Sequence, residues 1–421
     1  MAATALSLSV MPAQAFSPRS AEVGVTSTGI KLGITLPMTG SASYGYNQLP
    51  GAMKAYFDYV NANGGVNGRK ISLVVKDDGY LPKKAISNTQ DLIAKDKVMA
   101  IIGALGTANN KAVASAVNLG RRGIPSLFIN TGFSGFNDRK AFPTSSTILP
   151  SYIMEAKMMS KYVKDTHPGK KVCLLYQDDD FGDDALVGFS KTHGNLDFAV
   201  KVAYPSLSQG VAGVPDSWIT KFKTGGCEVQ IVFGVASATL YTILAAVKAQ
   251  YAPKWILGSV GADIGSINPA TVPYVIGTTS MSFMPSTVDP KDEYVAQFKE
   301  INTKYNAGAK FTSWALIGMN TAFIAVQALQ AAGKNPTRKS LLAAIDASGS
   351  KFPNAALVPL NYSKTSNVGL NGYWFGSFNK TGDLVPNDTF TYTVYTTDSG
   401  TGAVEKSTYS RPAMPAKGLP N

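Results

Sequence analysis

Cysteine and histidine are scarce in this chain, with two residues of each among 421. Two separated cysteines and two histidines in predicted loops, His167 and His193, do not have the spacing of a zinc site. Walker A, G-x-G-x-x-G and G-x-S-x-G patterns are also missing from the places where a nucleotide fold or a hydrolase needs them. We therefore expect no metal, no cofactor and no enzymatic activity.

Charged residues make up only 16% of the chain, and no uninterrupted apolar run reaches the roughly 18 residues of a membrane span. With 45% apolar residues, the composition is that of a globular protein. A length of 421 residues suggests two or three domains. Lys and Arg outnumber Asp and Glu by 39 to 27, which favours anionic ligands or surfaces as partners. Because the basic residues are scattered, no nucleic-acid binding is expected.

The first residues have the character of a signal-peptide remnant. A weakly apolar stretch leads to Ala13-Gln14-Ala15, an A-x-A-like cleavage motif. We expect an exported bacterial protein, periplasmic or on the cell surface, with the remnant and a disordered N-terminus over residues 1–28. An ordinary disordered N-terminus is the alternative reading.

Strands and helices alternate along most of the chain, which predicts α/β units with parallel sheets covered on both faces. Predicted strands span residues 30–36, 71–76, 98–102, 124–129, 171–176, 198–203, 229–233 and 255–258. Predicted helices begin near Leu49, Pro82 and Thr107 and span residues 183–192, 218–223, 238–250, 293–305 and 311–332. Short β-like runs follow at residues 372–379 and 389–396.

Cys173 and Cys227 lie near the starts of two strands that would be neighbours in a doubly wound sheet. An exported protein can join such a pair in a disulfide. Two buried free thiols are equally compatible with the sequence.

Two loops point to ligand chemistry or to helix capping. Residues 103–107 lead from a strand into a helix whose free N–H groups and positive dipole end suit an anion. The Thr107 hydroxyl is either a ligand donor, the helix N-cap, or both. Residues 130–134 follow the next strand and should lie beside it. The acidic run at residues 178–184 is read as helix capping, with calcium or paired-carboxylate chemistry as the alternative.

Residues 30–40 and the Asn-Gly-Gly-x-x-Gly-Arg stretch at residues 63–69 resemble segments of a known family. The family is that of the branched-chain amino acid (leucine/isoleucine/valine) substrate-binding proteins of ABC importers, which have the type 1 periplasmic-binding fold. The resemblance covers about residues 29–380, and its Asn-Gly-Gly-x-x-Gly-Arg stretch at residues 63–69 is quite specific. Other matching stretches are Lys76-Asp77-Asp78 with Pro82, and residues 176–182.

The resemblance implies two α/β lobes, joined by three crossovers, that close over a ligand in the cleft. The N-terminal lobe would hold residues 29–150 and about 283–358, and the C-terminal lobe residues 151–282 and about 359–421. It further implies a monomeric protein that captures a small carboxylate with high affinity and delivers it to the permease subunits of an ABC importer. A ligand-sensing receptor of the same fold is the alternative, and an enzyme is a more distant one.

The resemblance also assigns site residues. The ligand carboxylate would be held by Gly106 and Thr107 and by the loop of Asn130, Gly132, Phe133 and Ser134, while the ring of Tyr44 covers the ligand. On the α-amino side the sequence departs from the family pattern. Phe181 lacks the usual aromatic hydroxyl, the segment around Ala236 lacks the usual tyrosine, and Val260 stands at the acidic position.

Asp263 lies three residues after Val260 and is the candidate substitute for the missing acid. A buried ammonium without an acidic partner is unfavourable. The sequence therefore favours a carboxylate without an α-amino group, with an aromatic or hydrophobic body. Its apolar walls, for which core packing is the alternative role, are expected to be Tyr44, Tyr46, Phe133, Phe181 and Trp314.

Overall fold

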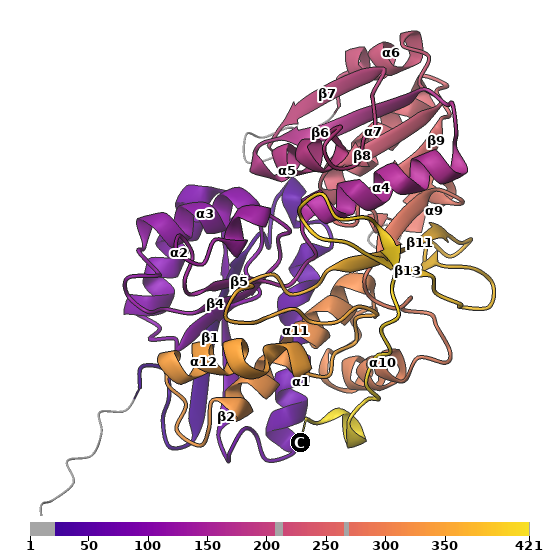
Figure 1. Ribbon diagram of the computed structural model, residues 1–421. Coiled ribbons are helices and arrows are strands. Elements are labelled where there is room, and N and C mark those ends of the chain that lie inside the picture. The colour runs from indigo at the N-terminus through magenta and orange to yellow at the C-terminus, as the bar shows by residue number, and fades with distance from the viewer. Residues whose placement is uncertain (1–21, 207–213, 265–268, 421) are drawn as a thin grey trace, which may run out of the picture.

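The computed structural model describes residues 22–206, 214–264 and 269–420 and contains two sheets with helices packed against them (Figure 1). The predicted cleavage motif lies outside the described residues. Residues 22–28, predicted to be disordered, are instead ordered. Val25 is buried and bridges to Ile30, because burying its apolar side chain holds the segment against the first strand.

The first sheet is parallel, with strand order β2-β1-β3-β4-β5. Its strands are β1 (Gly29–Leu36), β2 (Lys70–Asp77), β3 (Ala100–Ile102), β4 (Ser126–Ile129) and β5 (Ser145–Thr147). The connecting helices are α1 (Leu49–Ala62), α2 (Pro82–Ala94) and α3 (Thr107–Ala116). Helices α2 and α3 pack with Ile101 of β3 in one apolar cluster, whereas α1 packs with Ile102 in another, so the two faces of the sheet are covered separately.

Helix α1 forms where apolar residues recur at helical spacing. Leu49, Met53, Tyr56 and Val60 are all buried on one face. The helix ends at Asn63-Gly64-Gly65, as predicted, because both glycines take the positive φ angles of 103° and 67° that L-residues avoid.

The second sheet has the order β7-β6-β8-β9-β10-β11-β13-β14, with β12 paired to β11. It is parallel from β7 to β10 and antiparallel from β10 onward. Its strands are β6 (Val172–Asp178), β7 (Val200–Pro205), β8 (Val229–Phe233), β9 (Lys254–Leu257), β10 (Thr279–Ser282), β11 (Gly372–Phe378), β12 (Leu384–Val385), β13 (Val394–Thr396) and β14 (Glu405–Lys406). Its helices are α4 (Tyr152–Thr166), α5 (Asp180–Phe189), α6 (Asp216–Thr224), α7 (Ala236–Lys248) and α9 (Val272–Val275).

The acidic run caps a helix, as predicted. The Asp179 carboxylate accepts a hydrogen bond from the N–H of Phe181 at 3.0 Å, and α5 begins at Asp180, three residues earlier than expected. Asp180 and Asp183 occupy the first turn, where the helix dipole favours negative charge.

Three later helices return to the first sheet: α10 (Glu293–Tyr305), α11 (Ser313–Ala331) and α12 (Arg338–Ser348). By length and composition α11 alone among the described helices is apolar enough to cross a membrane. It packs instead against α1, α10 and α12, with 89% of its apolar window buried, so it is a core helix. We call the first sheet with α1–α3 and α10–α12 the first lobe, and the second sheet with its helices the second lobe.

The last part of the chain crosses between the lobes later than expected. Residue Val368 bridges to Thr147 of β5, and the Tyr362 hydroxyl donates to the Thr147 carbonyl at 2.7 Å. Residues 359–370 therefore lie with the first lobe, because the edge strand β5 offers unpaired backbone groups to them. Only from Gly372 does the chain join the second sheet.

The segment after β14, residues 407–420, is named the C-terminal tail. It runs back to the first lobe, where the chain ends beside α1 (Figure 1). The Tyr56 hydroxyl donates to the Gly418 carbonyl at 2.8 Å, and Arg411 pairs with Asp292 at 2.6 Å. The assignment of residues 359–421 to the C-terminal lobe thus fits only their middle part.

Cys173 and Cys227 are joined in a disulfide, with 5.7 Å between their Cα atoms. Strands β6 and β8 are adjacent in the sheet, as the proposed strand order required. Of the two alternatives left open by the sequence, the bridge is the one present in the structure.

Candidate ligand-binding site

The ends of β3 and β4 bring hydrogen-bond donors to one edge of the first sheet. Helix α3 starts at Thr107, directly after Gly106, whose φ of 101° is a conformation that glycine adopts without strain. Leu105 bridges to Asn130, and the Gly106 N–H donates to the Asn130 carbonyl at 3.3 Å. The first turn of α3, with its free N–H groups and positive dipole end, is thus fixed beside the end of β4.

Three hydroxyl groups cluster at this edge. The Thr107 and Thr131 oxygens are 2.7 Å apart, and the Tyr152 hydroxyl lies next to both threonines. Burial raises the pKa of Tyr152 well above its usual value, so this hydroxyl stays protonated and can donate. Gly106, not Thr107, occupies the N-cap position of α3, with no side-chain capping bond, so the capping role considered for Thr107 is not seen.

Asn130 holds the turn from the other side. Its Nδ2 donates to the Gly103 carbonyl at 2.9 Å. Its Oδ1 is buried without a hydrogen-bond partner among the described residues. A buried acceptor of this kind is ready for a ligand or water that donates.

A narrow cavity lies between the lobes next to these groups, and we call it the central cavity. The Tyr46 hydroxyl of the first lobe donates to the Val260 carbonyl of the second lobe at 3.0 Å. The Trp314 ring packs edge-on against the Tyr46 ring, with 4.5 Å between the ring centroids. The space is about 10 Å³, which is room for one water molecule. A larger ligand can enter only if the lobes separate or the rings turn. The cavity is lined by Tyr46, Tyr80, Leu105, Gly106, Asn130, Leu149, Tyr152, Phe181, Val235, Val260 and Trp314.

Ser134 already binds a carboxylate, which comes from the opposite lobe. Its N–H and its hydroxyl donate to the two oxygens of Asp184 in α5, at 2.5 and 2.9 Å. Burial raises the pKa of Asp184 to about 6 in spite of these two hydrogen bonds. Close by, Lys111 of α3 pairs with Asp180 of α5 at 2.6 Å. These contacts link α3 and the loop after β4 of the first lobe to α5 of the second lobe.

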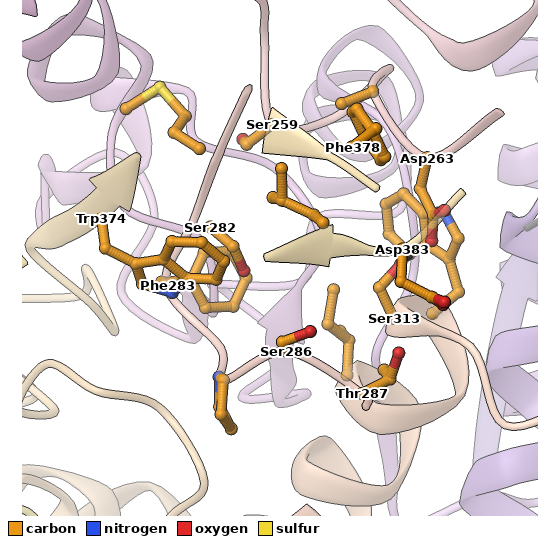
Figure 2. Close-up of a pocket in the computed structure, with 16 residues that line it drawn as sticks. Ser259, Asp263, Ser282, Phe283, Ser286, Thr287, Ser313, Trp374, Phe378 and Asp383 are labelled. Carbon is orange, nitrogen blue, oxygen red and sulfur yellow. Dashed lines mark hydrogen bonds between the residues drawn. The ribbon is translucent and has the colours of Figure 1, made fainter. Parts of the chain in front are cut away.

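A second space, the side chamber, adjoins the central cavity and shares Trp314 with it. It has a volume of about 60 Å³, enough for several water molecules. Aromatic and aliphatic side chains of both lobes line it, together with two carboxylates, Asp263 and Asp383 (Figure 2). The Asp263 carboxylate accepts a hydrogen bond from the Ser313 hydroxyl at the start of α11.

Residues 29–383 match the family model described as periplasmic binding protein. The chain belongs to this family. The predicted fold, a type 1 periplasmic-binding protein with two α/β lobes, is thereby confirmed. The family consists of substrate-binding proteins rather than enzymes. Membership of this family implies that the protein lies outside the cytoplasm.

Two relatives with assigned names resemble this periplasmic binding protein. An amino acid binding protein of Pseudomonas aeruginosa is 26% identical over 221 residues, which cover 49% of this chain and 53% of that protein. Leu/Ile/Val-binding protein homolog 2 of Brucella abortus is 24% identical over 314 residues, which cover 74% of this chain and 81% of that protein. The chain thus spans about half the length of the Pseudomonas relative.

Solved structures share the fold at low sequence identity. A substrate-binding periplasmic protein from Ralstonia solanacearum superimposes with a TM-score of 0.75 at 21% identity, covering 84% of this chain and 99% of that one. A branched-chain amino acid ABC transporter protein from Thermus thermophilus with bound valine superimposes with a TM-score of 0.71 at 17% identity, covering 91% of this chain and 98% of that one. A solute binding protein from Rhodopseudomonas palustris in complex with 3,4-dihydroxybenzoic acid superimposes with a TM-score of 0.69 at 20% identity, covering 84% of this chain and 94% of that one.

Four of the predicted site residues line the central cavity of this periplasmic binding protein: Gly106, Asn130, Phe181 and Val260. Thr107 lies directly behind them, buried in the hydroxyl cluster. The Phe181 ring lines the cavity and packs on the Tyr152 ring, with 4.4 Å between the ring centroids.

Tyr46 and Trp314, two of the residues predicted as apolar walls, also line the cavity, whereas the remaining predicted residues do not. Tyr44 is half-buried outside the cavity, and Tyr46 takes the place expected for it. Gly132 is packed so tightly that a Cβ there would come within 2.4 Å of the Pro150 carbonyl. Phe133 lies under the Lys111 ammonium, 4.9 Å away, and Ser134 is engaged by Asp184.

On the second lobe, Ala236 is buried as the first residue of α7, one position after the cavity-lining Val235. Asp263 lies in the side chamber rather than in the central cavity. Asp263, the acid proposed to pair the α-amino group of a ligand, is thus separated by the Trp314 ring from the hydroxyl cluster around Thr107.

Sequence reasoning missed two tyrosines of the cavity. Tyr80 follows the turn after β2 and has a positive φ of 65°, and Tyr152 opens α4 after β5. Both directly follow strands or loops at the same edge of the sheet, which is the signal that could have identified them.

Proposed function

We propose that this periplasmic binding protein is exported, captures a small carboxylate in the cleft by lobe closure, and delivers it to the permease subunits of an ABC importer. The proposal rests chiefly on one observation, the convergence of the Thr107, Thr131 and Tyr152 hydroxyls with the start of α3. An anion at this edge would meet neutral donors and the positive end of a helix dipole.

Ser134 supports the same chemistry. Its N–H and hydroxyl hold both oxygens of Asp184, which is the arrangement a ligand carboxylate would need. Because these donors are occupied by the second lobe in the closed arrangement, we assign the ligand carboxylate to the neighbouring Thr107 cluster and the first turn of α3. The Oδ1 of Asn130 is left to accept from a donor group of the ligand or from water. Ser134 then serves closure rather than binding.

The ligand class follows from what the cavity offers to an amino group. Among the described residues that line the central cavity, none is Asp or Glu. Val260 presents an apolar side chain, and its carbonyl already accepts from Tyr46. An α-ammonium would be buried without an acidic partner, which is unfavourable. We therefore favour carboxylates without an α-amino group, with an aromatic or aliphatic body against Tyr46, Phe181 and Trp314.

The ligands bound in two structural neighbours show that proteins of this fold hold both classes of carboxylate. The Thermus protein holds valine, an α-amino acid, and the Rhodopseudomonas protein holds 3,4-dihydroxybenzoic acid, which has no amino group. A periplasmic or cell-surface location is supported by the disulfide, which persists in oxidising compartments.

Matched pairs of ligands test the proposal. Calorimetry would compare valine with 3-methylbutanoate and phenylalanine with 3-phenylpropanoate, on full-length protein freed of co-purified molecules by unfolding and refolding with its disulfide intact. We expect the desamino acid to bind at least as tightly as its amino acid. A preference of more than tenfold for the amino acid would show that an acid such as Asp263 pairs the ammonium. No binding by any of the four would contradict the carboxylate proposal itself.

A further inference from the structure

Two residues that line the side chamber carry a buried polar atom without a hydrogen-bond partner among the described residues. Trp314 and Ser286 are each 4% exposed, and the Trp314 Nε1 and the Ser286 hydroxyl oxygen are unpaired among the described residues. Figure 2 shows the Ser286 hydroxyl directed into the chamber. Buried donors and acceptors are rarely left unpaired in proteins, because water and all competing partners have been removed.

Equivalent groups in the same chamber are paired, so the two unpaired ones stand out. The Trp374 Nε1 donates to the Met284 carbonyl at 2.7 Å, and the Ser282 hydroxyl donates to the same carbonyl at 3.1 Å. The chamber therefore pairs the Trp374 indole and the Ser282 hydroxyl with its own backbone, and it leaves the Trp314 Nε1 and the Ser286 hydroxyl to something that enters.

The chamber also provides negative acceptors. The Asp383 carboxylate accepts from the Thr381 hydroxyl at 2.6 Å, and no ion pair within residues 22–206, 214–264 and 269–420 includes Asp383. Asp263 and Asp383 lie on one side of the chamber and the rings of Phe283 and Trp374 on the other (Figure 2). A group bound there meets one donor-only indole N–H, one serine hydroxyl, and carboxylate acceptors.

We propose that the side chamber is a subsite for a hydroxyl group at the end of the ligand remote from its carboxylate. A hydroxyl accepts from the Trp314 N–H and donates to the Asp383 carboxylate at the same time. An ammonium has no lone pair and would leave the indole N–H unpaired. A second carboxylate would be repelled by Asp263 and Asp383, and a purely apolar end would satisfy none of these groups.

This inference rests on the proposed function, since Trp314 lines both spaces and a ligand held in the central cavity reaches the chamber along this ring. It narrows the ligand class to hydroxylated monocarboxylic acids. Phenolic and aliphatic hydroxyls share this chemistry, and the probes below separate them.

Calorimetry on the full chain would compare benzoate with 4-hydroxybenzoate, 3-phenylpropanoate with 3-(4-hydroxyphenyl)propanoate, and hexanoate with 6-hydroxyhexanoate. In the series that fits the cleft, we expect the hydroxylated member to bind about ten times more tightly, because its hydroxyl pairs the buried indole N–H that the parent acid leaves unpaired. Trp314→Phe, which keeps the ring and removes the N–H, should reduce this ratio to within about twofold. Trp255→Phe, the same substitution on β9 outside the chamber, should leave the ratio unchanged.

A ligand-free measurement checks the premise. Ser286→Ala removes an unpaired hydroxyl and should leave the thermal unfolding midpoint unchanged or higher, whereas Ser282→Ala removes a bonded hydroxyl and should lower it. An equal loss in both variants would mean that Ser286 has a partner and would overturn the subsite.

The binding outcomes separate the two proposals. Acids that bind with no gain from the hydroxyl, or with a gain that survives in Trp314→Phe, would overturn the hydroxyl subsite and leave the carboxylate site standing. Failure of every acid to bind would overturn the proposed function and the subsite with it.

Discussion

Thr107 is the single residue whose hydroxyl tests the carboxylate site most directly. Thr107→Ala should weaken binding of the best-bound acid by roughly ten- to a hundredfold, because it removes one charge-assisted hydrogen bond. The fold should be retained, since Gly106 and not Thr107 occupies the N-cap of α3. Calorimetry measures the affinity, and thermal unfolding checks the fold.

Thr107→Ser is the matched control, because serine keeps the hydroxyl at the same position. We expect its affinity to stay within a few-fold of the parent protein. An equal loss in the serine and alanine variants would point to packing of the threonine methyl group and away from a hydrogen bond.

The residues of the site differ in how far the sequence could predict them. Gly106 and Asn130 could be predicted, because glycine turns and polar side chains after parallel strands meet at one edge of a sheet. The contact between Ser134 and Asp184 could not be predicted, because Asp184 is 50 residues away in the sequence and reaches Ser134 only when the lobes meet. Asp263 was misplaced for a similar reason, because the turn around it directs this carboxylate to Ser313, behind the Trp314 ring.

Among the elements, the disulfide between β6 and the loop before β8 makes a direct prediction. It links residues 54 apart in the sequence, so loop-closure entropy predicts a stabilisation of about 4 kcal/mol. The unfolded, unreduced protein should react with no thiol label, and the reduced protein with two. Cys173→Ala/Cys227→Ala should unfold at lower denaturant concentration, and its stability should not respond to reductant. Two labels per unreduced chain would rule out the bridge in solution.

Elements with regular apolar spacing were predicted well, and those that bury charge were not. Helix α10 was predicted to the residue, and α1 was found together with its glycine stop. Helix α4 was missed, because Glu155 and Lys157 interrupt its apolar face and yet are buried. Their partners, Ser259 for Glu155 and Asp398 for Lys157, come from distant parts of the chain and leave no local signal.

Other elements that were missed, among them β5, β10 and α12, are short or weakly patterned. Strand β5 is the three-residue stretch Ser145–Thr147, which is polar and yet buried. Hydrophobic periodicity cannot identify such a segment, since its assignment depends on pairing with β4 and with Val368.

For the whole molecule, buried carboxyl groups predict how stability depends on pH. Burial raises the pKa of Glu155 to about 7 and those of Asp78 and Asp184 to about 6. In the unfolded chain these groups titrate near pH 4, so between about pH 4 and 7 the folded protein keeps protons that the unfolded chain releases. The free energy of unfolding should therefore fall as pH rises through this window and level off above it. Denaturant titrations at a series of pH values measure this slope.

In Glu155→Gln the free energy of unfolding should fall less steeply with pH, because the substitution removes the group that keeps its proton to the highest pH. Its total fall between about pH 4 and 7 should be smaller than in the parent protein by about 1–3 kcal/mol. Glu300→Gln, an exposed position on α10, is the matched control and should keep the parent slope. A slope that does not change in Glu155→Gln would mean that this carboxyl group is ionised throughout in the folded protein.

Closure of the two lobes is the largest change expected of the molecule. The central cavity of about 10 Å³ admits no ligand while Tyr46 contacts Val260 and Ser134 contacts Asp184, so binding requires an open form that closes afterwards. Solution scattering should give a smaller radius of gyration with a saturating amount of the best-bound acid than without it. An unchanged radius would contradict closure around a ligand.

The C-terminal tail should limit how far the lobes open, because it leaves the second sheet after β14 and is bound to the first lobe. Arg411 holds it there through Asp292 and the Ala355 carbonyl, at 2.6 and 2.7 Å, and the Tyr59 hydroxyl donates to the Lys417 carbonyl. Arg411→Ala should raise the radius of gyration of the ligand-free protein and leave that of the ligand-bound protein unchanged. Tyr59→Phe removes a more exposed contact and should act in the same direction with less effect on stability. Equal radii for parent and variants, with unfolding midpoints showing that both variants are folded, would mean that the tail follows the hinge without restraining it.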